Sequence, residues 1–548
     1  MKIKRLLVAN RGEIAIRIFR AATELNIETI GIYSYEDRYS LHRYKCDESY
    51  LVGEGKSPVD AYLSMDEIIE LAKSKHIDAI HPGYGFLSEN PLFAKKCIEA
   101  GIIFIGPHFS AIEIFGDKLM AKQTAQKLGI PTIPGSKNCI TSINELKEFA
   151  QEYDYPILIK ATKGGGGRGI RVVEKPQDLE SEYLMAKSES LKAFGSDEII
   201  AEKLVKNPKH IEIQILGDKF GNYVHLFERD CSIQRRHQKV VEIAPSLNIP
   251  EVLLQSMYSD SIKFAKETKL YNAATFEYLV DEEKKHYYFL EVNPRLQVEH
   301  TVTEMITGID IVQSQIKIAS DQPLKDILGT QENIHKKGYA FQCRITTEDP
   351  QNNFFPDTGK IEAYRSPAGF GIRLDAASAY TGALITPFYD SLLVKITAFG
   401  LTFEEAAKKM HRALREFRIR GIKNNLRFLE NLVSNKDFLK GDFNVHFLET
   451  HPEIFRFEKP RDRISKLLRF LGNNIVNKPN GEAKNIVFPT IVKPKAQGKI
   501  PEALRDVLLR EGPKSFIEKV KSSKEVLFCD TTFRDAHQSL LATRMRTK

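Results

Sequence analysis

Four consecutive glycines lie between two apolar stretches in residues 158–173, LIKATKGGGGRGIRVV. Glycine lets the backbone approach an anion closely and direct N–H groups at it, and Lys160 and Arg168 supply positive charge. The segment lacks the Gly-Lys-Ser/Thr sequence that opens the helix of a Walker A loop. The pattern therefore favours a loop that binds a phosphate chain, and a flexible hairpin tip is the alternative.

A second group of polar residues lies in a predicted hairpin, residues 274–281 and 286–300, joined by the polar sequence EEKK. Strand side chains repeat every two residues, so Glu291 and Asn293 share one face, and Glu277 on the partner strand can join them. Two carboxylates and an amide are costly to bury unless they bind something. The group suits Mg²⁺ that also contacts nucleotide phosphates. The alternative is a hairpin with one face in solvent.

A third stretch, ERDCSIQRRHQKVVEIAP at 228–245, is rich in cationic residues. Read as one strand, it places Arg235, His237 and Lys239 on the face opposite Arg236. With Arg295 and Glu299 from further along the chain, these residues could form a cationic pocket that holds one carboxylate. Such a pocket suits a small anion that must be neutralised and must lose a proton. An exposed basic strand remains the alternative.

The elements that must position these residues indicate several domains. Residues 5–110 alternate short apolar strands with helical stretches, which predicts βαβ units and a parallel sheet. Residues 118–330 mix helices with antiparallel strands, and a further α+β stretch follows from 338 to 448. Residues 459–501 read as a helix and an extended linker. The predicted fold class is thus α/β and α+β, in more than one domain.

Composition narrows the function. A chain of 548 residues is too long to fold around a single hydrophobic core, so about two to four domains are expected. The 80 Lys+Arg against 72 Asp+Glu suit an enzyme that handles anions, but no basic tract points to nucleic acid. Six scattered cysteines predict reduced thiols. Because no signal peptide and no membrane-length apolar run are found, we expect a cytoplasmic protein.

Seven motifs in order resemble one family. They are VANRGEIAIR, HPGYGFLSEN, GDKLMAK, KATKGGGGRGIR, ERDCSIQRRHQKVVE, FLEVNPRLQVEH and QCRI. Together they resemble the biotin carboxylase component of the biotin-dependent carboxylases, an ATP-grasp fold, over about residues 1–450. The resemblance implies an N-terminal domain at 1–117, an ATP-grasp domain at 118–330 with a glycine-rich lid at about 131–204, and a C-terminal carboxylase domain at 331–450.

The resemblance also implies a reaction. Bicarbonate is deprotonated and attacks the γ-phosphate of ATP, and the resulting carboxyphosphate releases CO₂ that biotin captures. Implied ATP contacts are Lys118, Lys160, Gly166, Gly167, Glu202, Lys203, Leu204, Val205, His210, Gln234 and His237. Implied ligands of Mg²⁺ or Mn²⁺ are Glu277, Glu291 and Asn293. Lys239, Arg295, Gln297 and the Val298 backbone would hold bicarbonate, Glu299 would be the general base, and Arg344 would stabilise the biotin enolate.

The residues after 450 resemble the branch of the family that carboxylates pyruvate. Residues 451–500 match its linker and allosteric region, and 501–548 match the start of its carboxyltransferase barrel, so we expect a truncated chain. Val526–Cys529 reads as the first barrel strand, and the resemblance implies Asp535 as a metal ligand and Gln538 near pyruvate. We expect this tail to be poorly anchored or packed on a borrowed surface. Arg418, Arg420 and Arg463 are candidates for binding an acetyl-CoA effector, with surface ion pairs as the alternative.

No Met-Lys-Met biotinylation motif occurs, so the resemblance implies that a carrier domain outside this chain supplies the biotin. Expected partners are that carrier, the carboxyltransferase and a second carboxylase domain, within a tetramer. Neither nucleic acid nor a membrane is expected as a partner. Two other functions stay open: the biotin carboxylase of an acyl-CoA carboxylase, and a non-catalytic module that binds a nucleotide or senses an effector.

Overall fold

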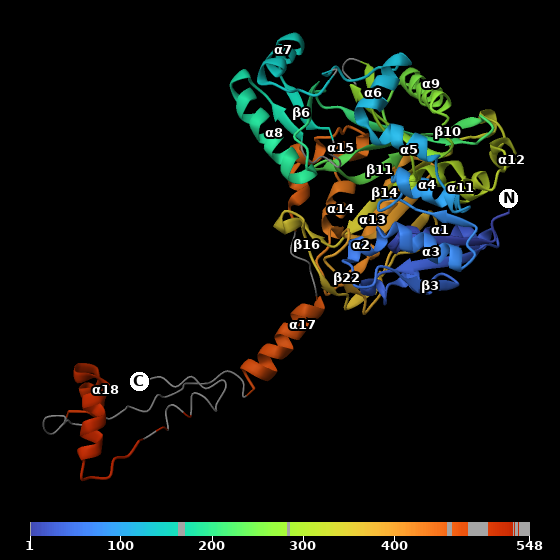
Figure 1. Cartoon of the computed structure of the whole chain (residues 1–548). Helices are drawn as coiled ribbons and strands as arrows, with labels where there is room; N and C mark the ends of the chain where they lie inside the picture. Colours follow the sequence, from blue (N-terminus) through green and yellow to red (C-terminus); the bar gives the residue numbers. More distant parts are fainter. Residues whose placement is uncertain are drawn as a thin grey trace. The chain divides into compact units, whose positions relative to one another are not determined.

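The computed structural model describes residues 2–136, 138–162, 170–281, 285–457, 463–479 and 502–529, together with Thr531 and Asp535. The chain forms two compact units, Met1–Glu458 and Lys459–Lys548. Both are drawn in Figure 1, where colour follows the sequence. No helix of the described residues is long and apolar enough to cross a membrane.

The N-terminal part of the first unit is a parallel sheet between helices (Figure 1), as the sequence predicted. Leu6 and Val8 pack with helix α1 on one face, and Leu7 packs with the opposite core, so strand β1 is apolar on both sides. The strand order is β3-β2-β1-β4-β5. The strands are β1 (Arg5–Val8), β2 (Glu28–Tyr33), β3 (Glu48–Leu51), β4 (Ala79–His81) and β5 (Ile103–Phe104). The helices are α1 (Gly12–Glu24), α2 (Pro58–Tyr62), α3 (Met65–Ser74), α4 (Pro91–Glu99) and α5 (Phe109–Gly116).

The centre of the first unit is an antiparallel sheet of eight strands, in the order β13-β12-β9-β10-β11-β14-β21-β19. It is continuous across residue 330, where the sequence analysis placed a domain boundary. Strands β14, β19 and β21 therefore join the strands that precede this boundary. The bounds are β9 (Lys209–Gly217), β10 (Tyr223–Arg235), β11 (Gln238–Ala244), β12 (Asn272–Asp281), β13 (His286–Asn293), β14 (Tyr339–Thr346), β19 (Ile372–Ala376) and β21 (Leu392–Gly400).

A smaller layer carries the segment predicted as the glycine-rich lid. Its three strands, β6 (Ile157–Ala161), β7 (Ile170–Val173) and β8 (Ile199–Lys203), are antiparallel in the order β7-β6-β8. Helices α7 (Ile143–Tyr153) and α8 (Leu179–Phe194) pack on them around a separate apolar core. The two strands that flank the glycine loop are antiparallel neighbours, while residues 163–169 lie outside the described part.

The remaining helices of the first unit cover the large sheet. In α13, Phe403, Met410 and Leu414 follow helical spacing and are buried with Ile396 of β21, so this helix closes the C-terminal core. The helices are α6 (Lys118–Lys127), α9 (Glu251–Glu267), α10 (His300–Thr307), α11 (Ile311–Ala319), α12 (Leu324–Leu328), α13 (Phe403–Glu416), α14 (Leu426–Val433), α15 (Lys436–Lys440) and α16 (Phe447–Thr450). Short strands are β15 (Glu348–Asp349), β16 (Phe355–Pro356), β17 (Gly359–Lys360), β18 (Ala363–Arg365), β20 (Leu384–Ile385) and β22 (Arg418–Arg420).

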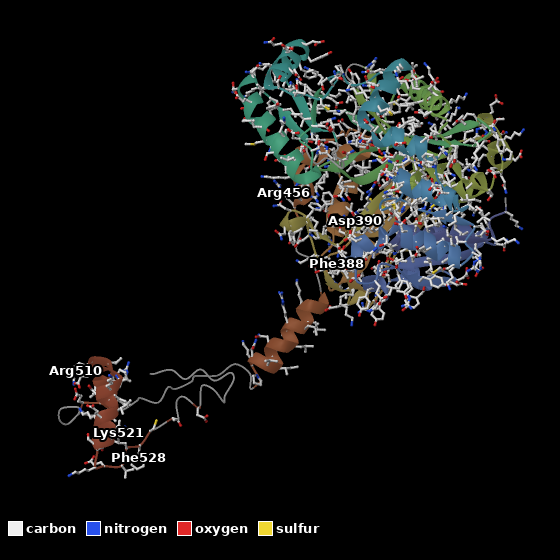
Figure 2. The ribbon with its side chains drawn as sticks, in the orientation of Figure 1. Phe388, Asp390, Arg456, Arg510, Lys521 and Phe528 are labelled. Atoms are coloured by element: carbon white, nitrogen blue, oxygen red, sulfur yellow. The ribbon has the colours of Figure 1, made fainter. Side chains whose placement is uncertain are left out.

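The described part of the second unit is helical. It contains α17 (Arg463–Gly472), which confirms the predicted helix, and α18 (Leu504–Ser522). The strand read at Val526–Cys529 is not formed, because these residues are irregular and exposed, and this agrees with the expectation that the tail is poorly anchored. Phe528, labelled in Figure 2, is 93% exposed. A strand needs neighbouring strands for stability, and the described residues of this unit contain none.

Candidate active site

Glu299 lies at the centre of the candidate site, in the loop that joins β13 to α10. Its carboxylate accepts hydrogen bonds from Lys239 Nζ at 2.8 Å and from Arg344 Nη2 at 3.1 Å. The side chain is buried, which by itself would favour the neutral acid, but the two cations lower the pKa of Glu299 far below its ordinary value. The structure thus brings together the predicted base and two predicted cations, and the base is ionised at neutral pH.

Lys239 is surrounded by three carboxylates. Its ammonium donates to Glu299, to Glu277 at 3.1 Å and to Glu212. These negative charges outweigh the effect of burial and raise the pKa of Lys239 well above its ordinary value. Lys239 is therefore a fixed positive charge beside the base.

The hairpin β12–β13 assembles the predicted metal site. Glu277 stands directly opposite Glu291, and Thr275 stands opposite Asn293, so these side chains share one face. Glu277 accepts from Asn293 at 2.7 Å and lies 2.7 Å from His210 Nε2, while Glu291 lies 3.5 Å from Lys118 Nζ. Two carboxylates opposite each other repel, and Lys239 beside Glu277 and Lys118 beside Glu291 offset part of this repulsion. Their oxygens and the Asn293 amide are a donor set that Mg²⁺ or Mn²⁺ favours, so the residues present fit such an ion.

The basic stretch is not one continuous strand, as the sequence analysis supposed. Strand β10 ends at Arg235 and β11 begins at Gln238, and the two residues between them form a turn with φ of 49° at Arg236 and 64° at His237. Arg235 instead lies over the Phe354 ring, 4.1 Å from its centroid. The turn therefore separates Arg235 and His237 from Lys239, which contacts Glu299. Arg235 still lines the cavity that Lys239 borders.

The predicted nucleotide residues form a second cluster around Glu202. This buried carboxylate lies 2.5 Å from Lys160 Nζ and 2.9 Å from Lys122 Nζ. Burial would raise its pKa, but the two lysines lower the pKa of Glu202 to about 2. Lys203 donates to the Tyr153 carbonyl at 2.5 Å, which ties β8 to α7. Leu204 and Val205 follow Lys203 in the predicted hinge of residues 202–205, which was expected to contact ATP. Gly166 and Gly167 lie outside the described residues.

Three other predicted residues lie around the base. Gln297 donates to Glu277 at 2.8 Å, and Arg295 Nη2 donates to Asn293 Oδ1 at 2.9 Å. Gln234 contacts His210 Nδ1 at 2.9 Å, so it supports a nucleotide residue from the sheet side. Arg295, Gln297 and Glu299 thus belong to one loop that is anchored to the metal hairpin.

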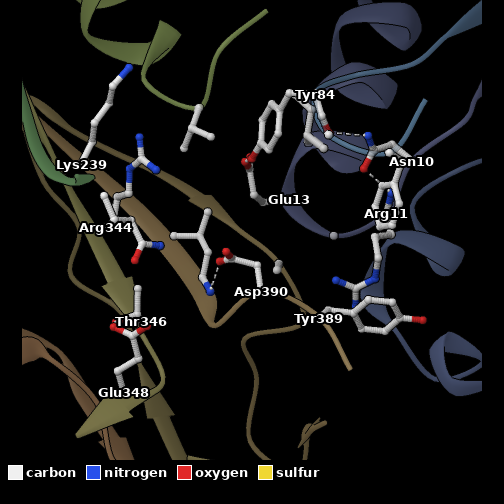
Figure 3. Close-up of a pocket in the computed structure, with 18 of the residues that line it drawn as sticks. Asn10, Arg11, Glu13, Tyr84, Lys239, Arg344, Thr346, Glu348, Tyr389 and Asp390 are labelled. Carbon is white, nitrogen blue, oxygen red and sulfur yellow. Dashed lines mark hydrogen bonds between the residues drawn. The ribbon is translucent and has the colours of Figure 1, made fainter. Parts of the chain in front are cut away.

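A cavity of about 520 Å³ is lined by Lys239 and Arg344, the two cations that hold Glu299. Figure 3 shows Lys239 and Arg344 on one side of it and Tyr84 with Asn10 on the other. The cavity therefore lies between the N-terminal sheet and the large sheet, and cations line it. Its polar lining includes Asn10, Arg11, Glu13, Tyr84, Gln238, Lys239, Arg295, Arg344, Thr346, Glu348 and Asp390.

Comparison with known proteins identifies the family. Three family models match in order: "Biotin carboxylase, N-terminal domain" at residues 2–112, "Carbamoyl-phosphate synthase L chain, ATP binding domain" at 117–327, and "Biotin carboxylase C-terminal domain" at 342–450. The biotin carboxylase domain of Hydrogenobacter thermophilus 2-oxoglutarate carboxylase is 47% identical, with a TM-score of 0.80. The match covers 84% of this chain and all of that domain. The chain belongs to the biotin carboxylase family. The Hydrogenobacter domain was solved as a dimer with MgADP, ADP and bicarbonate.

Pyruvate carboxylases from several organisms match the whole of this chain. The Bacillus subtilis enzyme is 53% identical and the human mitochondrial enzyme is 52% identical, each over all of this chain. The chain covers 48% and 46% of their lengths, so it spans about half of these relatives. A structure of Rhizobium etli pyruvate carboxylase with the allosteric activator acetyl coenzyme A is 48% identical, with a TM-score of 0.81, over all of this chain and 49% of that one.

Several residues that complete this biotin carboxylase site were missed in the sequence. Fully buried Arg229 donates to Glu212 at 3.1 Å and to Gln297 at 2.6 Å, and Glu242 accepts from Arg344 Nε at 2.6 Å. Burial and the nearby carboxylates raise the pKa of Glu212. Glu212 could have been found from the sequence of β9. In HIEIQIL, His210, Glu212 and Gln214 alternate with isoleucines, which predicts a strand with one polar face.

The predicted effector and barrel residues are only partly placed. Arg418 and Arg420 are exposed at the ends of β22, where Arg418 stands opposite Arg365 in the antiparallel register with β18. Arg463 begins α17, but its side chain is not among those described. The Asp535 amide donates to the Thr531 carbonyl at 2.8 Å, and Gln538 lies outside the described residues.

Proposed function

We propose that this chain uses ATP and bicarbonate to carboxylate biotin. The observation that carries the proposal is the position of Glu299, a buried and ionised carboxylate held between Lys239 and Arg344, which both line the cavity. A base in this position can take the proton of bicarbonate while Lys239 and Arg295 neutralise the anion. The Hydrogenobacter biotin carboxylase domain, solved with MgADP and bicarbonate, supports the assignment.

Deprotonated bicarbonate would then attack the terminal phosphate of ATP to give carboxyphosphate and ADP. Such a transfer depends mainly on position and on charge neutralisation. Lys118 and Lys160 would hold the phosphates together with the Gly166 and Gly167 backbone. Glu202 fixes the Lys160 ammonium at 2.5 Å, and the hinge that follows Glu202 would receive the base of the nucleotide.

Glu277, Glu291 and Asn293 would hold Mg²⁺ or Mn²⁺ in this mechanism. A bound divalent ion supplies positive charge to the phosphate oxygens. The chain prepares the site by directing His210 and Lys239 at Glu277 and Lys118 at Glu291. Lys239 and Lys118 balance the carboxylates of the hairpin face on which the nucleotide would bind.

Arg344 would stabilise the enolate form of biotin in the cavity. Its guanidinium is held by Glu242 and Glu299 and borders the open volume, so the residues present fit a group that gains negative charge. Biotin held beside Arg344 would capture the CO₂ that carboxyphosphate releases. Because this chain has no Met-Lys-Met motif, we propose that the biotin arrives on a carrier domain of a longer protein.

We further propose that the longer protein is a pyruvate carboxylase, which forms oxaloacetate from pyruvate, bicarbonate and ATP. The match to pyruvate carboxylases extends past residue 450 and favours this function over an acyl-CoA carboxylase subunit. The carrier and carboxyltransferase domains would be partners, and paired carboxylase domains would form part of a tetramer. Arg418, Arg420 and Arg463 would bind acetyl-CoA, and Asp535 would ligate the carboxyltransferase metal. The six unpaired cysteines support a reducing, cytoplasmic location.

The test is phosphate release from ATP by the purified chain, measured with and without bicarbonate and with free biotin present. We expect release to require both ATP and bicarbonate and to increase with free biotin. The second candidate, a non-catalytic nucleotide-binding module, predicts ATP binding without bicarbonate-dependent release. That result would overturn the proposed function.

A further inference from the structure

A buried ion pair connects the N-terminal sheet to the bicarbonate loop. Lys395 of β21 is fully buried, and its Nζ lies 3.0 Å from Glu13 Oε2 and 3.0 Å from the Val298 carbonyl oxygen. Glu13, at the start of α1, also accepts the hydroxyl hydrogen bond of Tyr84. The pair therefore joins three parts of the chain that surround the cavity.

Stability alone is a weak explanation for this pair. The free energy lost when two opposite charges leave water is about as large as the free energy gained from their attraction. A protein with an apolar pair of similar volume in their place is therefore often as stable. The remaining bond of Lys395 is directed at one peptide, the one between Val298 and Glu299. Of the described residues, Lys395 is the donor that fixes this carbonyl, whereas Gln297 is held separately by Arg229 and Glu277.

The position of that peptide decides the direction of the base. Glu299 follows Val298 directly, and its carboxylate must lie between Lys239 and Arg344 to meet bicarbonate. A shift of the peptide by a few tenths of an ångström would move the carboxylate away from both cations. Catalytic groups lose rate steeply with small displacements.

We propose that Lys395, oriented by Glu13, is a positioning residue that sets the backbone of the bicarbonate loop and thereby the direction of Glu299. The inference rests on the proposed biotin carboxylase function. Tyr84 lines the opposite wall of the cavity and shares Glu13, so the same pair fixes the spacing of the two walls. Lys395 itself does not touch substrate in this proposal.

The test uses a double-mutant cycle of Lys395→Met, Glu13→Gln and the two changes together. Lys395→Met leaves the Glu13 charge buried without its partner, and the double variant removes both charges. Asp375, opposite Lys395, keeps its ion pair with Arg373, so the double variant should recover most of the thermal stability. The bond to Val298 stays absent in both. We expect kcat/KM for bicarbonate to fall by at least about tenfold in both variants that lack Lys395, the effect of losing one charged hydrogen bond. KM for ATP should stay within about twofold, because the Glu202 cluster is untouched.

The matched control is Lys409→Met. Lys409 of helix α13 is half-buried and donates at 2.9 Å to the carbonyl of Phe399, which lies on β21 like Lys395. Lys409 itself lies outside the site. We expect wild-type bicarbonate kinetics from it. If bicarbonate kinetics recover together with stability in the double variant, the pair has only a structural role and the proposal is wrong. If neither Lys395 variant folds, Glu13→Gln decides, because unchanged bicarbonate kinetics would then overturn the proposal. Failure of the wild-type chain to cleave ATP would instead refute the proposed function.

Discussion

Glu299→Gln tests the assignment of the base most directly. Glutamine keeps the shape of the side chain but cannot accept a proton from bicarbonate. A general base contributes about a hundredfold to ten-thousandfold in rate. We therefore expect bicarbonate-dependent phosphate release to fall by at least about a hundredfold, which corresponds to about 2.7 kcal/mol of transition-state stabilisation.

The structure indicates that the rest of the site survives this change. Lys239 keeps Glu212 and Glu277 as partners, and Arg344 keeps Glu242. Neither cation is left buried without a carboxylate, so a large stability loss is not expected. The nucleotide cluster around Glu202 has no hydrogen bond to Glu299 among the described residues, so KM for ATP should be unchanged.

The assay measures phosphate release against bicarbonate at saturating ATP and free biotin, together with thermal unfolding. Glu228→Gln is the matched control, because Glu228 is equally buried and bonds Ser246 at 3.1 Å, away from the cavity. We expect near-normal turnover from the control. Turnover of Glu299→Gln within about threefold of wild type would remove Glu299 from the role of base.

Three further predictions concern the neighbouring sites. Glu202 has a pKa lowered from 4.5 to about 2, so it stabilises the fold above its unfolded-state pKa, and this contribution is lost as pH falls through the folded pKa. The stability difference between wild type and Glu202→Gln should be present at about pH 6 and vanish near pH 2, and a pH-independent difference would contradict the assignment. Glu291→Gln should raise the Mg²⁺ or Mn²⁺ concentration for half-maximal phosphate release by at least about tenfold, because one of two carboxylates is lost. In the longer protein, Arg420→Ala combined with Arg463→Ala should weaken acetyl-CoA binding in calorimetry, and unchanged affinity would place the effector site elsewhere.

Local patterns in the sequence predicted the elements whose signals are local. The apolar strands and intervening helices of residues 5–110 gave the parallel sheet, and the alternation in 274–300 gave the hairpin with Glu277 facing Glu291. The turn at Arg236 and His237 was missed because both residues adopt positive φ without the Asn-Gly or Asp-Gly sequence that marks such turns. The strand at Val526–Cys529 was predicted from composition, but composition cannot supply the neighbouring strands that it needs.

The composition of the site depends on strand order, which no local pattern contains. Each strand of the eight-stranded sheet contributes one member to a charged row on one face: Glu291, Glu277, Glu212, Arg229, Glu242, Arg344, Lys395 and Asp375. Direct pairing across neighbouring strands places Glu212 beside Arg229 and Lys395 beside Asp375.

Such a row is tolerable when buried only because opposite charges alternate along much of it. Of its three adjacent acids, Glu212 and Glu277 are offset by Lys239, and Glu291 lies beside Lys118. Where the row meets the loop at Glu299, one carboxylate is held by cations from both directions, Lys239 and Arg344. The register of the sheet therefore places the cations that keep Glu299 ionised. A slip of one residue in β14 would turn Arg344 to the opposite face and remove its charge from Glu299.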